Sequence, residues 1–540
     1  MKKYIQIACF ILLAVATGCA DWIDVEPENS VTFENYFKTE KDAQALLFNV
    51  EVKLRDIVGA PFTGTTELFT EKGYPDPTGK YGYTSVYPLL EYVGGSFEAY
   101  YAVIATADVI IDNAHRFSLD KEVIRPYVLQ AYFAKAYAYA KLAANFGEAP
   151  IVKESQSFKK YGKSSISEVL DEAEKWAELA LELPAYENLK LGDLTLTKQF
   201  ASKGAATALL AKIYAWRAGV EGKTDYWAKA EEMCTQIIEN KVGYYALEGD
   251  PEALCESGLK GESQESIWEI YRDEKEMGGI FYHSYLTNVI SFPVNITKNV
   301  TDDQSYYVTK KTVRAYYDEH DLRKDAFFWE TEADSIFIVA TSKGNVPMTS
   351  HTEMDSVVVR YDNQEIEKAY LTKFRFGTYV FEDWSPAPQF QGMCQHVVKC
   401  RLADIMLLRA ECRVRQNKSN AAEDLNTVRR RAYWGKEKPA NPENRYAYEY
   451  PNADDVAKGL DGDLQLAIFR EREKELLQEG HRYYDARRNG VEYVQRFFSD
   501  YATLSETDIR DGALYAAISA TAFDNNDLLR QNVYWNRREQ

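Results

Sequence analysis

Hydrophobic residues recur every three or four positions along much of the chain, which is the spacing of one face of a helix. Thr39-Glu40-Lys41-Asp42 has the form of a helix start, and apolar residues follow it at helical spacing. This pattern predicts helices at residues 40–57, 97–115, 125–146, 165–182, 200–218 and 225–240, and later at 400–416, 420–433 and 461–478. Paired helices of this kind predict a mainly α, tetratricopeptide-like helical-repeat scaffold, because one pair alone cannot bury its apolar face.

Two regions break the helical pattern. Residues 59–96 are rich in Gly, Pro, Thr and Tyr, and they predict a long aromatic loop. Residues 246–398 predict an irregular, loop-rich insertion with small strands, such as Ser266–Ile270 and Ser356–Arg360. We therefore expect an N-terminal helical part at 19–245 that contains the long loop. We expect a C-terminal part at 246–540, with helices at about 399–490 and an irregular tail.

The charge and the aromatic content narrow the class of ligand. Acidic residues outnumber basic ones by 83 to 64, so the formal net charge of -19 opposes binding to nucleic acid. The chain has 39 Tyr, 25 Phe and 9 Trp. Tyrosine joins a flat apolar face to a hydroxyl, which suits surfaces that bind polar ligands, although packing between helices is the ordinary role of any single Tyr.

The first residues indicate export. Lys2 and Lys3 precede an apolar run, Ile5–Ala16, that is too short to span a bilayer, and we expect residues 1–18 to be a signal peptide. Val15–Cys19 resembles a bacterial lipobox, in which Cys19 is lipidated and becomes the mature N-terminus. Acyl chains on Cys19 would hold the protein at the cell outer membrane, exposed at the surface, because each buried CH₂ contributes about 0.8 kcal/mol. The acidic residues that follow are similar to export signals of surface lipoproteins in the Bacteroidetes.

Four stretches in the same order resemble the SusD/RagB family of nutrient-binding outer-membrane lipoproteins. They are Ala134–Val152, Gln264–Ile270, Arg401–Arg431 and Arg470–Arg488. The last stretch, REREKELLQEGHRYYDARR, is the most specific, and Asp527–Tyr534 extends the resemblance towards the end of the chain. The sequence departs from the family pattern at Tyr483, where the family usually has Trp, and at 525–527, where the family is richer in proline.

The fourth stretch is expected to be structural. Glu471, Arg472, Lys474 and Glu475 alternate in charge at helical spacing, which predicts a paired or solvated helix face. Gly480 predicts the end of that helix. We expect four charged residues beyond it to tie the helix exit to the repeat helices. These residues are Arg482, Asp485, Arg487 and Arg488.

Three short patterns have residue types that could form metal or catalytic sites. Glu479, His481 and Asp485 could ligate a metal, but they lie within the scaffold stretch just described. Cys394, His396 and Cys400 are three ligands without a fourth, and Asp461-Gly462-Asp463 is either a calcium loop or a solvated turn. The chain has only 6 His and neither a Gly-x-Ser-x-Gly nor a His-Glu-x-x-His motif. We expect no catalytic residues, no metal and no cofactor, and hence no enzyme.

The resemblance implies a protein that captures an oligosaccharide or polysaccharide at the cell surface and delivers it to a partner, a SusC-like TonB-dependent outer-membrane transporter. Two alternatives keep the fold: binding of peptides, as implied for RagB-like relatives, or a structural lid of the transporter without ligand affinity. Aromatics in loops are the candidate glycan contacts, although packing competes as a role for each. They are Tyr74, Tyr81, Tyr83, Tyr87, Tyr282, Tyr285 and Trp384. Five cysteines besides Cys9 and Cys19 are an odd number, so at least one stays unpaired.

Overall fold

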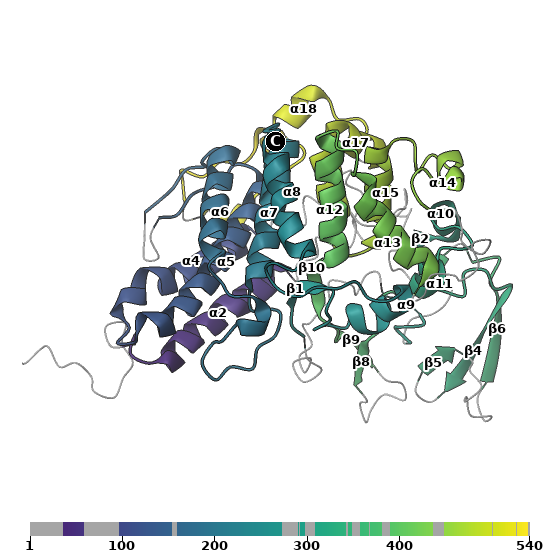
Figure 1. Cartoon of the computed structure of the whole chain (residues 1–540), viewed down its shortest axis with the longest axis horizontal. Coiled ribbons are helices and arrows are strands. Elements are labelled where there is room, and N and C mark those ends of the chain that lie inside the picture. Colours follow the sequence, from purple (N-terminus) through teal and green to yellow (C-terminus); the bar gives the residue numbers. More distant parts are fainter. Residues whose placement is uncertain are drawn as a thin grey trace, which may run out of the picture.

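The computed structural model of the chain describes residues 36–58, 97–153, 159–272, 290, 292–296, 308–341, 344–347, 357–366, 368–380, 389–435, 448–498, 501–524 and 526–537. Long helices form two groups in this part, and a two-stranded ribbon lies between them (Figure 1). Small sheets project beside the second group of helices. The predicted mainly α architecture with a small-strand insertion is confirmed.

The first group is an array in which each helix packs against the next along the chain. Its long helices are α2 (Glu40–Val58), α4 (Phe97–Asn113), α5 (Lys121–Phe146), α6 (Ile166–Ala180), α7 (Lys203–Val220) and α8 (Tyr226–Ile238). The 3-10 turns η3 (Ala114–Arg116) and η4 (Tyr186–Asn188) lie in the connections. These helices match the six predicted in this half, and α5 begins about one turn earlier than predicted, at Lys121.

Small residues give α7 a face that other elements approach closely. Ala205, Ala208, Ala211 and Ala215 of this helix are at most 2% exposed. Near its end, a Cβ added to Gly219 would lie 2.3 Å from the backbone oxygen of Arg488. The contact between α7 and α16 (Arg482–Asn489) therefore requires a glycine at this position.

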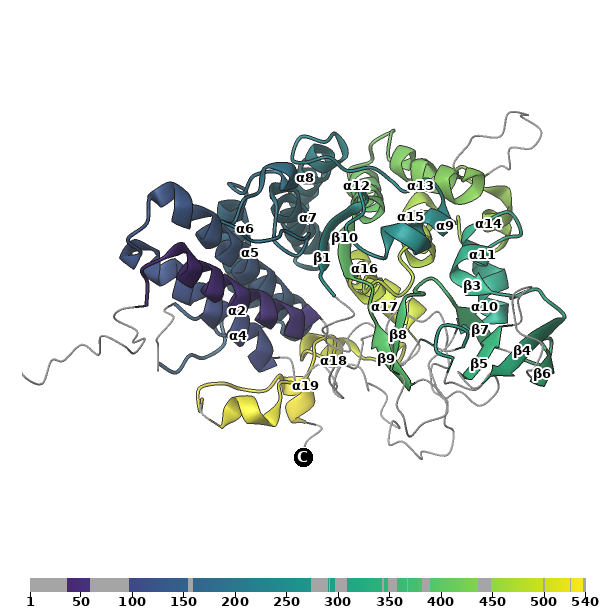
Figure 2. The same cartoon turned by 90° about the horizontal axis from the view of Figure 1, so that it is seen from below.

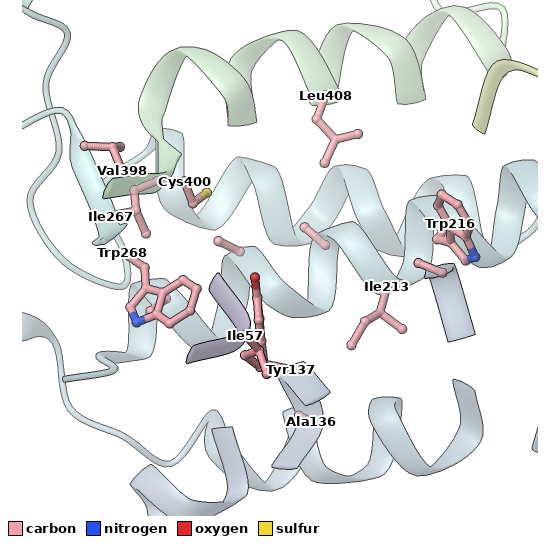
Figure 3. Packing of buried hydrophobic residues seen from close by; sticks show 14 of the residues in the cluster. Ile57, Ala136, Tyr137, Ile213, Trp216, Ile267, Trp268, Val398, Cys400 and Leu408 are labelled. Carbon is pink, nitrogen blue, oxygen red and sulfur yellow. The ribbon is translucent and has the colours of Figure 1, made fainter. Parts of the chain in front are cut away.

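The ribbon connects the two helix groups. It pairs β1 (Ser266–Ile270) with β10 (Val397–Arg401) in antiparallel order. α12 (Leu402–Arg415) follows β10 directly and packs against α8, α13 (Ala422–Trp434) and α15 (Leu464–Glu475). Figure 3 shows side chains from α5, α7, the ribbon and α12 meeting in a hydrophobic core that spans both groups. The predicted strand at 266–270 and the predicted helices near 400, 420 and 461 are confirmed.

The end of α15 differs from the prediction. The helix ends at Glu475, and Gln478 has a left-handed φ of 63°. Lys373 Nζ donates hydrogen bonds to the backbone oxygens of Glu475 at 3.0 Å and of Leu477 at 2.8 Å. Because these carbonyls are satisfied by a distant side chain, the helix stops before Gly480. The prediction that Gly480 ends the helix was wrong for this reason.

The tail, predicted to be irregular after about residue 490, contains short helices. They are α17 (Val491–Phe497), α18 (Glu506–Arg510), η9 (Ala520–Phe523) and α19 (Val533–Asn536), and α14 (Ala453–Ala457) precedes α15. Figure 2 shows α18 and α19 returning to the first helix group. There the backbone N–H of Ala516 donates to the oxygen of Asn145 at 2.7 Å, and Lys163 Nζ donates to Asn532 Oδ1 at 2.7 Å. The tail is ordered by these long-range contacts, which have no periodic signature.

The insertion is built from small antiparallel sheets. β7 (Lys368–Leu371) lies between β2 (Val308–Thr309) and β3 (Phe328–Trp329), while β4 (Ser335–Thr341) lies between β5 (Gly344–Pro347) and β6 (Val357–Asp362). β8 (Gly377–Val380) pairs with β9 (Gln389–Met393). Short helical segments accompany them: α9 (Pro251–Ala253), the π-turn η5 (Leu254–Gly258), α10 (Lys310–Tyr316) and α11 (Arg323–Phe327). The predicted strand at 356–360 corresponds to β6.

A network of buried ion pairs joins α11, β10, α13 and α15. Arg323 Nη1 lies 2.6 Å from Glu471 Oε1, and Arg429 Nε lies 2.9 Å from Glu471 Oε2. Arg401 contacts Glu475 and also Glu479, with Nη2 2.7 Å from Glu479 Oε1. The predicted face of alternating charge on α15 is therefore paired but not solvated, because its partners come from other segments of the core.

The residues after Gly480 make their ion pairs within the second helix group, whereas the prediction named the repeat helices, against which α16 packs through α7. Arg472 contacts Asp404 of α12 and Asp485 of α16, each at 2.7 Å. Arg488 contacts Glu411 of α12 at 2.5 Å. Charged side chains thus fix α15 and α16 against α12.

The cysteines in the described residues are free. Cys234, Cys255, Cys400 and Cys412 are buried, and Cys394 is half-buried. Burial raises the pKa of the Cys234 thiol, so this side chain behaves as a small apolar group. Among the described helices, none combines the length and the apolar character that crossing a bilayer demands.

Candidate functional site: an aromatic, acidic cleft in the insertion

An open cleft with a volume of about 780 Å³ lies in the insertion, and we call it the insertion cleft. Its walls are the strand β3 with the turn that follows it, the residues after β7, the segment at 293–294 and one side of β8. Its lining residues are Glu252, Pro293, Val294, Asp325, Phe328, Trp329, Glu330, Thr331, Glu332, Ala333, Thr372, Arg375 and Tyr379. The volume falls in the range of about 300–1,000 Å³ that is usual for ligand sites.

Two half-buried aromatic side chains line the insertion cleft. The Trp329 ring lies edge-on to Phe292 and Tyr370, with centroids 5.6 Å and 5.8 Å away, so a small hydrophobic cluster supports it from behind. Tyr379 packs against Phe390 at 5.5 Å, and its hydroxyl donates to the backbone oxygen of Val294. Both rings are therefore held in place before any ligand arrives, and rigid aromatic faces suit the apolar C–H faces of sugar rings.

The turn at 330–334 is also held rigidly. Asn363 is fully buried, and its Nδ2 donates to the backbone oxygens of Glu330 and Ala333, each at 2.7 Å. Lys310 Nζ donates in turn to Asn363 Oδ1 at 2.6 Å. Within this turn, the Thr331 hydroxyl is buried and has no hydrogen-bond partner among the described residues. An unpaired buried hydroxyl in the wall of a cleft is a ready partner for a polar ligand.

The charge of the lining is negative. Four acidic residues line the insertion cleft, against one basic residue, Arg375. Arg375 is already engaged, because its guanidinium contacts Glu252 at 2.5 Å and donates to the oxygen of Ala326 at 2.7 Å. A hydrogen bond from Arg314 lowers the pKa of Glu332, so this carboxyl stays ionised at neutral pH. Glu252 is paired with Arg375, and Glu332 is paired with Arg314 and Lys324, so the negative excess of the lining comes from Asp325 and Glu330. The described lining thus favours neutral or cationic ligands over anionic ones.

The candidate residues from the sequence lie outside the described part of the chain. This holds for Cys19 and for all the aromatic candidates, and both sets remain predictions. The aromatic candidates are Tyr74, Tyr81, Tyr83, Tyr87, Tyr282, Tyr285 and Trp384. Two of the segments that carry these candidates are close in sequence to residues that line the insertion cleft. Segment 273–289 ends shortly before Pro293, and segment 381–388 begins shortly after Tyr379.

Sequence reasoning missed Trp329, Thr331 and Tyr379. The predicted candidates are aromatic residues in loops, many of them rich in glycine and proline, whereas Trp329 is the last residue of a short apolar strand. The available signal was the abrupt change from Phe327-Phe328-Trp329 to the acidic, polar run Glu330-Thr331-Glu332. Such a change marks a strand that ends at a solvated turn.

The residues of the possible metal and catalytic patterns make other contacts. Glu479 pairs with Arg401 and Lys373, and Asp485 pairs with Arg472 and Arg488. Burial lowers the pKa of His481, whose Nδ1 lies 3.9 Å from Asp404. The solvated-turn prediction for 461–463 holds for Gly462 and Asp463, which are exposed, but not for Asp461, which is buried against Arg429 at 2.7 Å; Asp463 also caps α15.

His396 is close to two carboxylates, those of Glu262 and Glu269. Its Nδ1 lies 2.6 Å from Glu269 Oε1, and ligand atoms of Glu262, Glu269 and His396 all lie within 4.8 Å of one another. The remaining oxygens accept protein hydrogen bonds: Glu262 accepts from Tyr186 at 3.1 Å, and Glu269 accepts from Ser266 at 2.6 Å. These contacts identify a hydrogen-bonded cluster that supports β1.

Comparison with known proteins identifies similar sequences and folds. A profile described as "Starch-binding associating with outer membrane" matches residues 21–215, and the profile of the SusD family matches residues 260–535. SusD-like protein P2 of Formosa agariphila is 24% identical over 508 residues, which cover 90% of this chain and 91% of that protein.

Solved structures share the fold at low identity. A SusD homolog from Bacteroides thetaiotaomicron is 18% identical, with a TM-score of 0.67, covering 92% of this chain and 98% of that one. Surface glycan-binding protein A from Bacteroides uniformis is 17% identical, with a TM-score of 0.60, covering 92% of this chain and 100% of that one.

Proposed function

This chain belongs to the SusD family, and from that premise we propose that it is a cell-surface lipoprotein that captures a neutral glycan and delivers it to a TonB-dependent outer-membrane transporter. The family consists of binding proteins associated with the outer membrane. The single observation that carries the proposal is the insertion cleft, where Trp329 and Tyr379 are fixed beside an unpaired Thr331 hydroxyl. Flat rings and a few polar groups are what capture of a sugar chain requires, without any chemical step.

A neutral glycan is favoured by charge. Four carboxylates and one engaged guanidinium line the insertion cleft, and the whole chain carries a formal charge of -19. A uronate-containing or sulfated polymer would be repelled by the carboxylates of the insertion cleft and by the net negative charge of the protein. We therefore expect an uncharged polysaccharide as the cargo.

Membrane attachment is proposed through Cys19. The lipobox-like residues Val15–Cys19 support it, and the acyl chains would hold the protein close to its transporter. Replacement Cys19→Ala is expected to abolish incorporation of labelled palmitate and to release the protein from the membrane fraction. Retention of the label in this variant would contradict the anchor.

Native affinity electrophoresis and calorimetry test the binding proposal. The purified protein is compared against starch, xylan, mannan and β-glucan, against alginate and polygalacturonate, and against a peptide mixture. Retardation by a neutral polymer is expected, with none by the acidic polymers. If only peptides bind, the cargo is a peptide. If neither glycans nor peptides bind, the protein is a structural cover of the transporter without ligand affinity of its own.

A further inference from the structure

A second cavity lies inside the helical array, and we call it the interhelix cavity. It is bounded by α5, α7, the start of β1, α12 and the residues from Glu479 to Arg488, and its volume is about 130 Å³. It shares no lining residue with the insertion cleft. An apolar protein cavity of about 150 Å³ can hold a benzene molecule, so this space has the size for one small ring.

Aromatic and aliphatic side chains form most of the wall. Tyr137 and Trp268 lie with ring centroids 4.9 Å apart, and Trp216 lies 6.1 Å from Tyr484 on the other side. Figure 3 shows Tyr137 pointing from α5 towards α7, with Trp268 beside it and Leu408 above on α12. Ala140 is half-buried and lines the same space. The interhelix cavity therefore fits a flat, apolar body.

One polar atom in this wall has no partner among the described residues. The Trp216 Nε1–H is buried and donates to nothing, and the residue is 7% exposed. A buried donor without an acceptor destabilises the fold by about 1–3 kcal/mol, so this N–H indicates an occupant that accepts a hydrogen bond.

The lining of the interhelix cavity has more basic than acidic side chains. Five lysine and arginine side chains line the cavity, against three carboxylates, and one of the five, Arg488, is also paired with Glu411 outside the lining. Lys212 Nζ lies 2.7 Å from Asp404 Oδ2 and donates to the oxygen of Lys399 at 3.2 Å, but Asp404 is shared with Arg472 at 2.7 Å. The Lys212 side chain lines the cavity and keeps 32% of its surface accessible. An anionic group would complete this arrangement.

We propose that the interhelix cavity binds a small aromatic carboxylic acid, with the carboxylate at Lys212 and the ring between Tyr137, Trp216 and Trp268. The carboxylate supplies the acceptor that the Trp216 Nε1–H lacks. The binding is separate from capture of a glycan and does not depend on it, because the two sites share no residue.

Three probes of one shape test the charge requirement: benzoate, benzyl alcohol and benzylamine. Ligand-observed NMR and calorimetry on the purified protein should show benzoate binding with a Kd on the order of 1 mM, as expected for so few atoms. Benzyl alcohol and benzylamine should bind at least about tenfold more weakly. Equal binding of the three probes, or no benzoate binding up to about ten times that concentration, would overturn the proposal.

Variants locate the site. Ala140→Leu fills the space and should abolish benzoate binding, whereas Ala102→Leu, at a half-buried position of α4 away from the cavity, should leave it unchanged. Lys212→Met should remove the preference for benzoate over benzyl alcohol, and Trp216→Phe, which keeps an aromatic ring but removes the Nε1–H, should weaken benzoate binding severalfold. Unchanged binding in Lys212→Met and Trp216→Phe would overturn the proposal even if Ala140→Leu failed to fold. Glycan retardation should be the same in all four variants.

Discussion

Arg401 Nη1 lies 2.8 Å from Glu475 Oε1, and neither side chain is more than 1% exposed. Glu475 also accepts from Arg431 and from Arg323, the latter at 3.2 Å. Three guanidinium groups from β10, α13 and α11 thus converge on a single carboxylate of α15. Burial alone would raise the pKa of Glu475, but these cations outweigh it and hold the pKa well below its usual value.

Replacement Glu475→Gln should therefore be among the most damaging single changes in the second helix group. It keeps the shape but removes a carboxylate that three buried guanidinium groups share, so each keeps only its other acidic partners, and this costs about 3–5 kcal/mol of unfolding free energy. Denaturant unfolding measures the loss. Lys41→Ala removes an ion pair with Asp193 in which both side chains are more than two-thirds exposed, and it should change stability by less than about 0.5 kcal/mol. A similar loss of unfolding free energy in Glu475→Gln and Lys41→Ala would contradict the prediction that the buried ion pairs matter more for stability than the exposed one.

A second prediction concerns pH. Burial raises the pKa of Glu51 to about 8, while a hydrogen bond from Gln199 at 2.8 Å and the charge of Arg55 oppose the shift only in part. The folded protein keeps this carboxyl neutral over a range in which the unfolded chain ionises it. Its contribution to stability is therefore complete below about pH 4.5 and is lost as the pH rises towards 8.

Glu51→Gln removes this titration. The variant and the original protein should have similar unfolding free energies at about pH 4, and the variant should be more stable at pH 8 by on the order of 2–4 kcal/mol. Unfolding curves at several pH values measure the difference. If the difference in unfolding free energy between the variant and the original protein is the same at pH 4 and pH 8, the pKa of Glu51 is not raised.

Gly219→Ala tests the close approach of α7 and α16. At an exposed helix position, this change would stabilise by about 0.5–1 kcal/mol. Here the new Cβ would meet a backbone oxygen at 2.3 Å, which side-chain rotation cannot relieve, so a loss of about 1–3 kcal/mol is expected. The midpoint and slope of denaturant unfolding measure it, and a stabilised variant would show that the two helices separate easily.

Trp329→Ala should weaken binding of the neutral glycan identified in the panel by about tenfold or more, because the ring offers a stacking face in the insertion cleft. Trp176→Ala is the matched control, since Trp176 is also half-buried but lies on α6 outside the cleft. Calorimetry gives both affinities. Equal affinities for the original protein and the Trp329 variant would move the glycan site away from the insertion cleft.

The acidic lining can be tested by neutralising Asp325 and Glu330, which are both exposed. The double change Asp325→Asn and Glu330→Gln should leave affinity for a neutral glycan within about twofold, since no attraction to charge is lost. Alginate or polygalacturonate should then show weak retardation at low salt that fades at high salt. Continued exclusion of both acidic polymers would show that another feature rejects them.

Helix positions were predictable because their signal is local. The spacing of Ala43, Leu47, Val50 and Leu54 places one face of α2 in the core, and all four are at most 1% exposed. The charged residues of α15 were visible in the same way, but their partners were not. Arg401 and Glu475 are 74 residues apart, and nothing in either neighbourhood distinguishes a buried pair from a solvated one.

The insertion cleft was also unpredictable, because it depends on contacts between residues far apart in the sequence. Trp329 is held by Phe292 and Tyr370, and the turn beside it is held by Asn363. These supports come from separate strands and loops, so no window of sequence contains the site. Composition indicated an aromatic-rich binding protein, whereas the position of the rings follows from pairing between β3 and β7.

The distance along the chain between these partners also sets an order of events during synthesis. The contact of Arg401 with Glu475 cannot form until Glu475 has been synthesised. The hydrogen bond of Asn145 in α5 likewise requires Ala516, which is synthesised much later. The first helices can form early, but their final contacts depend on the last residues made. The core can therefore be completed only when the whole polypeptide is present.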